Sequence, residues 1–578
     1  MNPNIQLSQI FIDGLAHAGL TDVVICPGSR STPLTLAFDA HPTIQIHLAL
    51  DERSGAFFAL GLGMRTGKSA AIVCTSGTAA ANFYPAIIEA NMSQVPLMVL
   101  TADRPPELRH SGANQTIDQV KMFGDHVLWA VDMPLPDERM PDVAWRNVAT
   151  TAARAYATAN GLRKGAVHLN FPFRKPLEGP VYSGKWGTGS GQQFQPVICA
   201  FPQDKVDTLA NWFATFEKGI IVCGPNCPAG DFSEAVNQLA LKSGYPIFAD
   251  PLSNVRFDSN KSSTIVGGYE TWLAGGRKPE WGAPDVVIRF GAVPTSKWLN
   301  QYLSDIDTAV RLHIRESGVW ADDSHQTTHF WQINETEFCK KAADIAINFY
   351  SERLKTPPYG TWQKSVMDWE HSNWERLEKQ MANIEFDAAY LFDLLKHDAL
   401  NNCNLIIGNS LPVRHLDAFC RPSSKNIRVF GNRGASGIDG VVSTACGVAA
   451  ADPECHTILV IGDVSFYHDM NGLLAARKLP NLTIVLFNNN SGSIFRRLPI
   501  SKYKRPFDEL FLTAHDLDFS HTAALYGLVH RRFIERQKFN DGMSEALRSE
   551  QTNLFEIMTD GAQDEQIRKK VVSNVFGG

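Results

Sequence analysis

Oxygen-bearing side chains follow two predicted strands in the last third of the chain. The stretch TILVIGDVSFYHDMNGLL places Gly462 and Asp463 at the end of a strand, and LTIVLFNNNSGSIF places residues 488–490, all asparagine, at the end of the next. A carboxylate and amide oxygens at neighbouring strand ends are hard ligands, suited to a Mg²⁺ ion whose other positions hold phosphates and water. The alternative is that Asp463 caps the following helix and the asparagines form a turn.

A second acidic residue stands at the start of a predicted helix near the N-terminus. In HLALDERSGAFFALGLG, Glu52 lies just past a strand and in the first turn of the helix that follows. An acid in this position ordinarily complements the helix dipole, and that is one interpretation. The other is a proton-handling carboxyl, since burial can tune its pKa for acid-base work.

Four arginines lie on loops rich in glycine or proline beside predicted strand ends. The loops are PGSRSTP (27–33), LTADRPPELRHSGANQTIDQ (100–119), GNSLPVRHLD (408–417) and FGNRGASGIDG (430–440), and they carry Arg30, Arg104, Arg414 and Arg433. A planar guanidinium can hold a carboxylate through two parallel hydrogen bonds, so these loops favour substrates with several carboxylates. For each arginine alone, a surface salt bridge is the alternative.

The Gly-Asp pair, followed one helix and one strand later by Asn-Asn, resembles the cofactor signature of thiamine-diphosphate enzymes. That signature usually has a second glycine after the aspartate, where this chain has Val464. The arginine-bearing loops and the segment around Glu52 resemble the menaquinone-pathway branch of the family, which also has an aliphatic residue at that position. The resemblance extends over both predicted cofactor-binding domains.

The resemblance implies a site for thiamine diphosphate with Mg²⁺ or Mn²⁺. Asp463, Asn489 and the backbone carbonyl of Ser491 would hold the metal that clamps the diphosphate. Glu52 would hydrogen-bond the aminopyrimidine ring of a cofactor whose diphosphate lies on another subunit, and would assist removal of the proton from its thiazolium carbon. A homodimer with active sites at the subunit interface, or a dimer of such dimers, is therefore expected.

Further cofactor contacts are implied for Ser410, Gly462, Ser465 and Ile438. Ile438 would sit under the cofactor and force its bent conformation, a role that needs bulk rather than polarity. The alternative for this isoleucine is ordinary core packing.

The substrates implied by the resemblance are 2-oxoglutarate, which would lose its 1-carboxylate, and isochorismate, which would keep both of its own. Arg414 and Arg433 would hold the distal carboxylate of 2-oxoglutarate, with a basic contribution from Lys297 and an apolar wall at Phe495. The isochorismate side would be lined by Ser29, Arg30, Arg104, Asn114 and Gln115. Two rivals remain, a related lyase that acts on pyruvate and a non-catalytic relative, and for Phe495 simple packing is the alternative.

Repeated β-strand and helix patterns must position these residues. Short apolar runs such as DVVIC, SAAIVC, GIIVCG, NLIIGNS and TILVIG alternate with helical stretches, which is typical of parallel sheets that bind ligands at their carboxyl edge. We expect an α/β fold of three consecutive doubly wound parallel-sheet domains, at residues 1–182, 197–352 and 380–578. A Gly- and Ser-rich linker is predicted at 182–196 and a Pro-interrupted break at 354–362.

The composition excludes several classes of function. The 578 residues carry a formal net charge of -6, which gives no electrostatic basis for binding nucleic acid or an anionic membrane. No apolar run is long enough to span a bilayer, and the first residues lack the pattern of a signal peptide. The ten cysteines are scattered without metal-ligand spacing, so we expect a cytoplasmic protein with reduced thiols, in which Cys26 and Cys74 are core residues. No G-x-G-x-x-G motif supports a flavin in the central domain.

Overall fold

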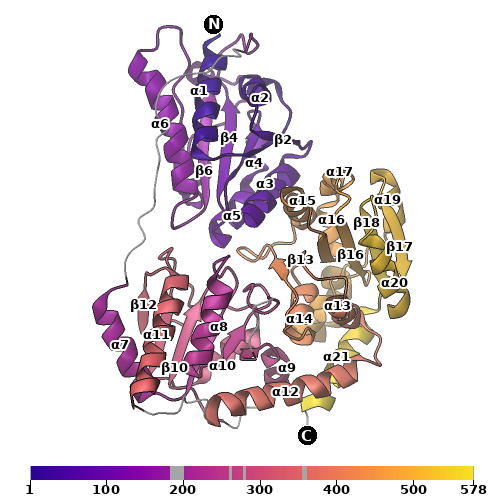
Figure 1. The fold of residues 1–578 in the computed structure, drawn as a ribbon. Helices are drawn as coiled ribbons and strands as arrows, with labels where there is room; N and C mark the ends of the chain where they lie inside the picture. Colours follow the sequence, from indigo (N-terminus) through magenta and orange to yellow (C-terminus); the bar gives the residue numbers. More distant parts are fainter. Residues whose placement is uncertain (1, 182–200, 259–262, 277–280, 354–360, 577–578) are drawn as a thin grey trace.

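Three parallel sheets of six strands each form the framework of the protein (Figure 1). The computed structural model describes residues 2–181, 201–258, 263–276, 281–353 and 361–576. The predicted linker at 182–196, and most of the predicted break at 354–362, lie outside the described residues. The expected α/β class with three consecutive parallel sheets is confirmed. Within the described ranges, no helix is both long enough and apolar enough to cross a membrane.

The first sheet has the strand order β2-β1-β3-β4-β6-β5. Its central strands are continuous apolar runs that are buried throughout, as expected of a parallel sheet covered by helices on both faces. The strands are β1 (Asp22–Ile25), β2 (Gln45–Leu48), β3 (Ala70–Cys74), β4 (Leu97–Asp103), β5 (Trp129–Asp132) and β6 (Ala166–Pro172), and the helices include α1 (Pro3–Ala18), α2 (Thr32–Asp39), α3 (Glu52–Thr66), α4 (Thr78–Ala81), α5 (Tyr84–Ser93) and α6 (Asp142–Ala159).

The third sheet repeats this topology, because its order β14-β13-β15-β16-β18-β17 places the strands in the same succession. Its strands are β13 (Cys403–Ile407), β14 (Ile427–Phe430), β15 (Thr457–Gly462), β16 (Leu482–Asn488), β17 (Val529–Phe533) and β18 (Asn553–Met558). Its helices include α13 (Asp387–Lys396), α14 (Leu411–Phe419), α15 (Val441–Ala451), α16 (Asp463–His468), α17 (Leu473–Ala476), α18 (Lys504–Phe507), α19 (Phe519–Tyr526), α20 (Arg536–Ala546) and α21 (Gly561–Phe576).

The central sheet has a different order, β12-β11-β10-β7-β8-β9. Its strands are β7 (Gly219–Cys223), β8 (Ile247–Ala249), β9 (Ile265–Val266), β10 (Val286–Phe290), β11 (Val310–Ile314) and β12 (His329–Trp331), and its helices are α7 (Gln203–Thr215), α8 (Phe232–Ser243), α9 (Tyr269–Ala274), α10 (Lys297–Asp305) and α11 (Glu335–Arg353). Helix α12 (Thr361–Met381) runs along the outside of the molecule from the central to the third domain (Figure 1).

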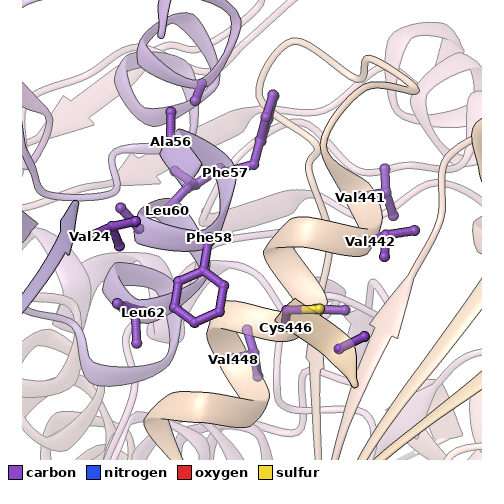
Figure 2. Packing of buried hydrophobic residues seen from close by; sticks show 14 of the residues in the cluster. Val24, Ala56, Phe57, Phe58, Leu60, Leu62, Val441, Val442, Cys446 and Val448 are labelled. Atoms are coloured by element: carbon purple, nitrogen blue, oxygen red, sulfur yellow. The ribbon is translucent and has the colours of Figure 1, made fainter. Parts of the chain in front are cut away.

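Helices α3 and α15 join the first and third domains in one hydrophobic cluster (Figure 2). Their apolar side chains face one another at a crossing where each helix has a glycine. A Cβ added to Gly61 would lie 2.2 Å from the carbonyl oxygen of Thr444, and one added to Gly447 would lie 2.1 Å from that of Phe58. The two backbones therefore approach more closely than any other residue type would allow.

The predicted core cysteines are both buried. Cys26 and Cys74 belong to the same cluster and are 1% and 0% exposed, which confirms their interpretation as packing residues.

Candidate active site

The carboxyl edge of the third sheet brings together the oxygen donors predicted from the sequence. Asp463 is 2% exposed, and its Oδ2 accepts hydrogen bonds from the backbone N–H groups of Asn489 at 3.0 Å and Ser491 at 3.2 Å. Oδ1 accepts one from Val464 N–H at 2.7 Å, and Nε2 of His515 lies 3.4 Å from Oδ2. Burial raises the pKa of the Asp463 carboxyl, while these hydrogen bonds and His515 oppose the rise.

The alternative interpretation of this motif is met only in part, because Gly462 and not Asp463 is the N-cap of α16, and no side chain caps the helix. Asp463 is the first residue of α16, and Asn490 has a φ of 56°, typical of a turn. The Asn489 side chain, however, points its Oδ1 toward the hydroxyl groups of Ser491 and Ser493, at 3.1 and 2.8 Å. The carboxylate, the amide oxygen and the nearby loop carbonyls make a donor set that fits a hard divalent cation. The described residues contain no group of three His, Cys, Asp or Glu side chains able to hold a metal.

Open space lies directly beside this donor set. A Cβ added to Gly462 would meet no heavy atom within 4 Å, although Gly462 ends a strand whose other residues are buried. Ser465, two residues past Asp463, donates a hydrogen bond to the Ile438 carbonyl at 2.9 Å and so fixes the loop that carries this half-buried isoleucine. The predicted cofactor residues Gly462, Asp463, Ser465 and Ile438 therefore share one edge of the sheet.

The ends of the next two strands, β13 and β14, place Ser410, Arg414 and Arg433 at the same edge. Ser410 precedes α14 with a φ of 71° and a ψ of -126°, a strained conformation of the kind found at functional sites. Its carbonyl accepts a hydrogen bond from Arg414 at 2.6 Å. Asn409 connects this loop to the following one, since its side chain donates to the Asn432 carbonyl at 2.8 Å and accepts from Arg433 at 2.7 Å.

A buried acid of the first domain holds the Arg433 loop in place. The Glu89 carboxylate is 2% exposed and accepts hydrogen bonds from the backbone N–H groups of Gly434 at 2.8 Å and Ala435 at 2.7 Å. Burial raises the pKa of Glu89, and the nearby Arg433 opposes that rise. Sequence reasoning missed both Glu89 and Asn409. Asn409 lies inside a motif that was singled out, whereas Glu89 stands in an ordinary helix without any signal.

Two of the first-domain residues predicted for isochorismate, Arg104 and Gln115, contact Ser76, a serine that follows β3. Arg104 donates to Ser76 Oγ at 2.7 Å, and Gln115 donates to the Ser76 carbonyl at 2.9 Å. Arg30 donates to the Phe173 carbonyl at 2.7 Å, and burial together with the charge of Arg104 lowers its pKa. Ser29 and Asn114, which precede Arg30 and Gln115 in the sequence, are exposed. Ser76 itself was overlooked, although it belongs to the polar TSGT loop.

Glu52 begins α3 and lines a cavity between the first and third domains. The cavity has a volume of about 500 Å³, and its lining includes His47, Leu50, Glu52, Asn471 and Tyr526. No described residue donates a hydrogen bond to the Glu52 carboxylate, while its neighbour Asp51 caps the helix by accepting from Ser54 N–H at 3.2 Å. The lining of this cavity includes none of the predicted metal-site residues Asp463, Asn489 and Ser491.

The two remaining predicted substrate residues are Lys297 and Phe495. Lys297 is exposed at the first position of α10, with its Nζ 5.7 Å from the centre of the Trp298 ring. Phe495 is half-buried and packs edge-on against Phe511 at 5.4 Å between ring centres. Their assignment to a substrate stays a prediction.

The fold and this edge define a thiamine-diphosphate enzyme, and comparison with known proteins agrees. Residues 5–122 match the N-terminal binding domain of thiamine pyrophosphate enzymes, 190–407 the middle domain, and 419–557 the C-terminal binding domain. A 4-hydroxybenzoylformate decarboxylase from Rhodococcus jostii RHA1, dependent on thiamine diphosphate, has a similar fold, with a TM-score of 0.71 at 17% identity over 96% of this chain and 99% of that one.

The full-length relatives are more specific. A 2-succinyl-5-enolpyruvyl-6-hydroxy-3-cyclohexene-1-carboxylate synthase from Roseiflexus castenholzii is 46% identical over 97% of both chains. Proteins of the same name from Haloquadratum walsbyi and Geobacillus kaustophilus are 38% and 40% identical, and cover 100% and 98% of this chain and 98% and 96% of their own. The chain belongs to the family of 2-succinyl-5-enolpyruvyl-6-hydroxy-3-cyclohexene-1-carboxylate synthases.

Proposed function

We propose that the protein decarboxylates 2-oxoglutarate and adds the resulting four-carbon unit to isochorismate, giving 2-succinyl-5-enolpyruvyl-6-hydroxy-3-cyclohexene-1-carboxylate and carbon dioxide in menaquinone biosynthesis. One observation carries the choice of substrates. Arg30, Arg104, Arg414 and Arg433 are buried or half-buried, yet none of them forms an ion pair with an acid among the described residues. Guanidinium groups that are shielded from water and form no ion pair with the protein are suited to bind the carboxylates of a substrate.

The cofactor residues present in the chain fit thiamine diphosphate and a divalent metal. When bound, this cofactor supplies the electron sink that allows a 2-oxo acid to lose carbon dioxide. Asp463, the Asn489 side chain and the Ser491 carbonyl would hold Mg²⁺ or Mn²⁺, and the open space beside Gly462 would admit the diphosphate. Ser410, Ser465 and Ile438 would contact the cofactor.

The substrate groups fall into two sets. Arg414 and Arg433, with Lys297 nearby, would orient 2-oxoglutarate through its distal carboxylate, and Phe495 would help to exclude water from the reacting carbon. Isochorismate would be bound on the first-domain side by Ser29, Arg30, Arg104, Asn114 and Gln115, of which Arg104 and Gln115 contact Ser76.

A homodimer, or a dimer of such dimers, would complete each site. Glu52 lines a cavity whose lining includes none of the predicted metal ligands, so it would serve the cofactor held by a second subunit, where its carboxyl would accept and return a proton at the aminopyrimidine ring. Exposed apolar residues next to Glu52 support such an interface. Leu48, Leu50 and Leu525 are 62%, 64% and 76% exposed, which is unusual for a surface that remains in water.

A cytoplasmic location and the division of the chain at 1–182, 197–352 and 380–578 complete the proposal. The nine described cysteines are all free, as is usual where thiols stay reduced. Each proposed domain contains one complete sheet.

Substrate choice tests the proposal. The wild-type protein, with thiamine diphosphate and Mg²⁺, should release carbon dioxide from 2-oxoglutarate in the presence of isochorismate and should not act on pyruvate. Glu52→Gln should lower kcat by about 10²-fold or more, because the proton transfer loses its carboxyl. Turnover of pyruvate alone would favour the rival lyase, and full activity of Glu52→Gln would contradict the role of this residue.

A further inference from the structure

The loop of residues 432–438, which carries Arg433, is bound to its own domain at both ends. At its start, the Asn409 side chain donates a hydrogen bond to the Asn432 carbonyl at 2.8 Å and accepts one from Arg433 at 2.7 Å. Near its end, Asn409 also donates to the Gly437 carbonyl at 2.5 Å. One asparagine of the third domain therefore fixes the two ends of this loop, and its middle is held from a different domain.

Glu89, on helix α5 of the first domain, holds the middle of the Arg433 loop. Its Oε1 accepts a hydrogen bond from Gly434 N–H at 2.8 Å, and its Oε2 accepts one from Ala435 N–H at 2.7 Å. The hydroxyl of Ser93, the last residue of α5, donates to Oε1 at 2.5 Å. All three groups are donors, and donors favour the ionised carboxylate, which opposes the rise in pKa that burial causes.

The loop and helix α5 are packed too closely for a side chain at Gly434. A Cβ added there would lie 2.7 Å from the Cβ of Met92 and 2.7 Å from the backbone nitrogen of Ser93. The loop backbone therefore approaches α5 at a distance that requires glycine. Because Arg433 directly precedes this glycine, its position depends on the first domain as well as on the third.

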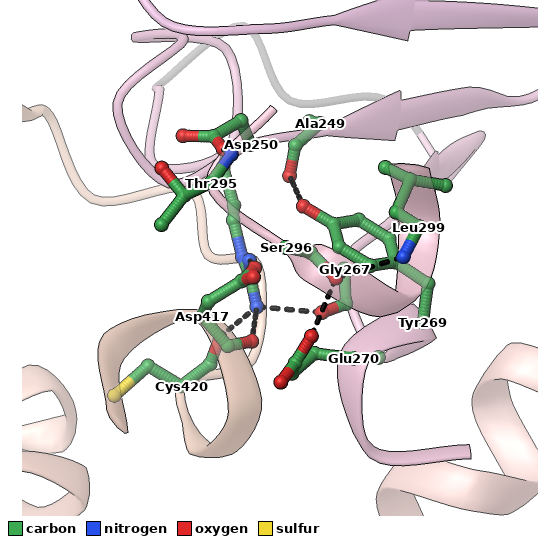
Figure 3. Close-up of polar contacts among 12 residues, drawn as sticks. Ala249, Asp250, Gly267, Tyr269, Glu270, Thr295, Ser296, Leu299, Asp417 and Cys420 are labelled. Atoms are coloured by element: carbon green, nitrogen blue, oxygen red, sulfur yellow. Dashed lines mark hydrogen bonds and ion pairs between the residues drawn. The ribbon is translucent and has the colours of Figure 1, made fainter. Parts of the chain in front are cut away.

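The other arginine proposed for the distal carboxylate, Arg414, is held by the central domain (Figure 3). It lies on α14, and the buried Arg256 of the central domain binds the C-terminal end of that helix. Arg256 donates to the Asp417 carboxylate at 2.8 Å and to the carbonyls of Asp417 and Cys420 at 2.7 and 2.8 Å. A change at Glu89 removes none of these contacts, so it tests the Arg433 loop separately from α14.

We propose that Glu89 is a positioning residue, which sets Arg433 in place to bind the distal carboxylate of 2-oxoglutarate. It does so at the active site of its own chain, because the loop that it holds belongs to the same chain. Glu52, in the same first domain, is proposed to serve the cofactor on the second subunit, so each first domain would act at two active sites. This inference rests on the proposed function, since it concerns the same carboxylate and the same shared sites.

The variant Glu89→Gln keeps the shape of the side chain and removes one of the two oxygens that bind the loop. One of the N–H groups of Gly434 and Ala435 then faces an amide N–H₂ group, and the loop moves away from α5. The KM for 2-oxoglutarate should rise by about tenfold or more, which corresponds to one lost hydrogen bond between charged groups. The affinity for thiamine diphosphate, measured by calorimetry, should not change, because Ser465 still binds the Ile438 carbonyl. General damage to the fold would weaken the binding of the cofactor as well.

Ser93→Ala is the matched control, because it removes the third hydrogen bond to Glu89 and leaves both bonds to the loop. It should keep the wild-type KM for 2-oxoglutarate. A rise as large as that of Glu89→Gln would mean that any disturbance of α5 has this effect, and would overturn the proposal. A fall in KM in Glu89→Gln would mean that Glu89 acts through its charge on Arg433, and would overturn it too.

Gly434→Ala displaces the loop without changing Glu89. Its Cβ would push the loop away from Met92 and Ser93, so the KM for 2-oxoglutarate should rise as it does in Glu89→Gln, with unchanged affinity for thiamine diphosphate. If Glu89→Gln does not fold, this second variant decides the matter. A folded Gly434→Ala protein with the wild-type KM would overturn the proposal.

Mixed dimers test which of the two sites Glu89 serves. When a Glu52→Gln chain pairs with an Asp463→Ala chain, the intact site joins the Arg433 loop of the first chain to Glu52 of the second. Adding Glu89→Gln to the Glu52→Gln chain should raise the KM for 2-oxoglutarate. Adding it to the Asp463→Ala chain should leave the wild-type value, and any other pattern would overturn the proposal.

The failure of this proposal is distinct from the failure of the proposed function. A wild-type protein that does not turn over 2-oxoglutarate would contradict the proposed function. Mixed dimers without activity would contradict the shared sites, and with them the claim that Glu52 and Glu89 serve different sites. Active wild-type and mixed proteins, beside a folded Glu89→Gln with an unchanged KM for 2-oxoglutarate, would contradict only the role of Glu89.

Discussion

The glycine crossing between α3 and α15 provides a sharp test of how the fold positions its chemistry. In the variant Gly447→Ala, the new Cβ would stand 2.1 Å from the Phe58 carbonyl oxygen and 2.9 Å from Leu62 N. Both contacts are with backbone atoms, so the rotation of a side chain cannot relieve them. Carbon and oxygen atoms in such contacts settle at about 3.3 Å, which requires the two helices to separate by about 1 Å.

This displacement lowers the free energy of unfolding. Overpacking of a tight core costs about 1 to 3 kcal/mol, and the upper part of the range applies because neither backbone can yield locally. Glu52 is the first residue of α3, so it moves with the helix. A displacement of about 1 Å in a catalytic group can lower the rate by roughly 10²-fold.

Thermal unfolding and steady-state kinetics measure the two effects together. We expect Gly447→Ala to unfold several degrees below the wild type and to lose most of its kcat. Gly161→Ala is a matched control, because its Cβ would come no closer than 3.3 Å to any atom outside its own neighbours. A Gly447→Ala protein with wild-type melting temperature and kcat would refute this description of the crossing.

Three further predictions address the cofactor edge, the domain junction and the assembly. Gly462→Ala should melt at the same temperature as the wild type, since its Cβ meets no heavy atom within 4 Å. Its affinity for thiamine diphosphate, measured by calorimetry, should nevertheless be lower. Unaltered affinity would mean that the diphosphate lies elsewhere. At the domain junction, the Asp469 carboxylate accepts hydrogen bonds from Ser443 N–H at 2.7 Å and from the Ser54 hydroxyl at 3.3 Å. Burial raises the pKa of Asp469 to about 6, so the folded state holds an extra proton between about pH 4 and 6 and loses stability as pH rises through that window. Melting curves of Asp469→Asn should lack this loss of about 3 kcal/mol, and parallel pH profiles of the two proteins would disprove the assignment. Mixing and refolding the inactive variants Glu52→Gln and Asp463→Ala should restore about a quarter of wild-type activity, because about half of the dimers are then mixed and each mixed dimer has one intact site of two. No recovery of activity would argue against sites shared between subunits.

Much of the fold was predictable because buried parallel strands are continuous apolar runs. Strand β3, with the sequence AAIVC, is buried at every residue and was expected as a strand. Edge strands gave no such signal. Strand β17, with the sequence VHRRF, exposes two arginines and owes its place to pairing with β18 across the sheet.

The candidate site likewise contains residues that the sequence predicts and residues that it does not. Asp463 and Asn489 end neighbouring strands of one sheet, so their proximity follows from sequence spacing and the parallel topology. Glu89 binds backbone N–H groups more than 300 residues away, and no residue type is required of the partner. Arg256 likewise acts on backbone carbonyls at a domain junction. Contacts of this kind depend on how domains pack, which periodicity and motifs do not encode.

The most direct test of the central claim follows the carbon atoms of the reaction. The purified protein, with thiamine diphosphate and Mg²⁺, is supplied with isochorismate and with 2-oxoglutarate labelled with ¹³C at carbon 1. The account predicts labelled carbon dioxide in equal amount to an unlabelled adduct that retains both isochorismate carboxylates and the four remaining carbons of 2-oxoglutarate. Labelled carbon dioxide without that adduct, or no release of label at all, would contradict it.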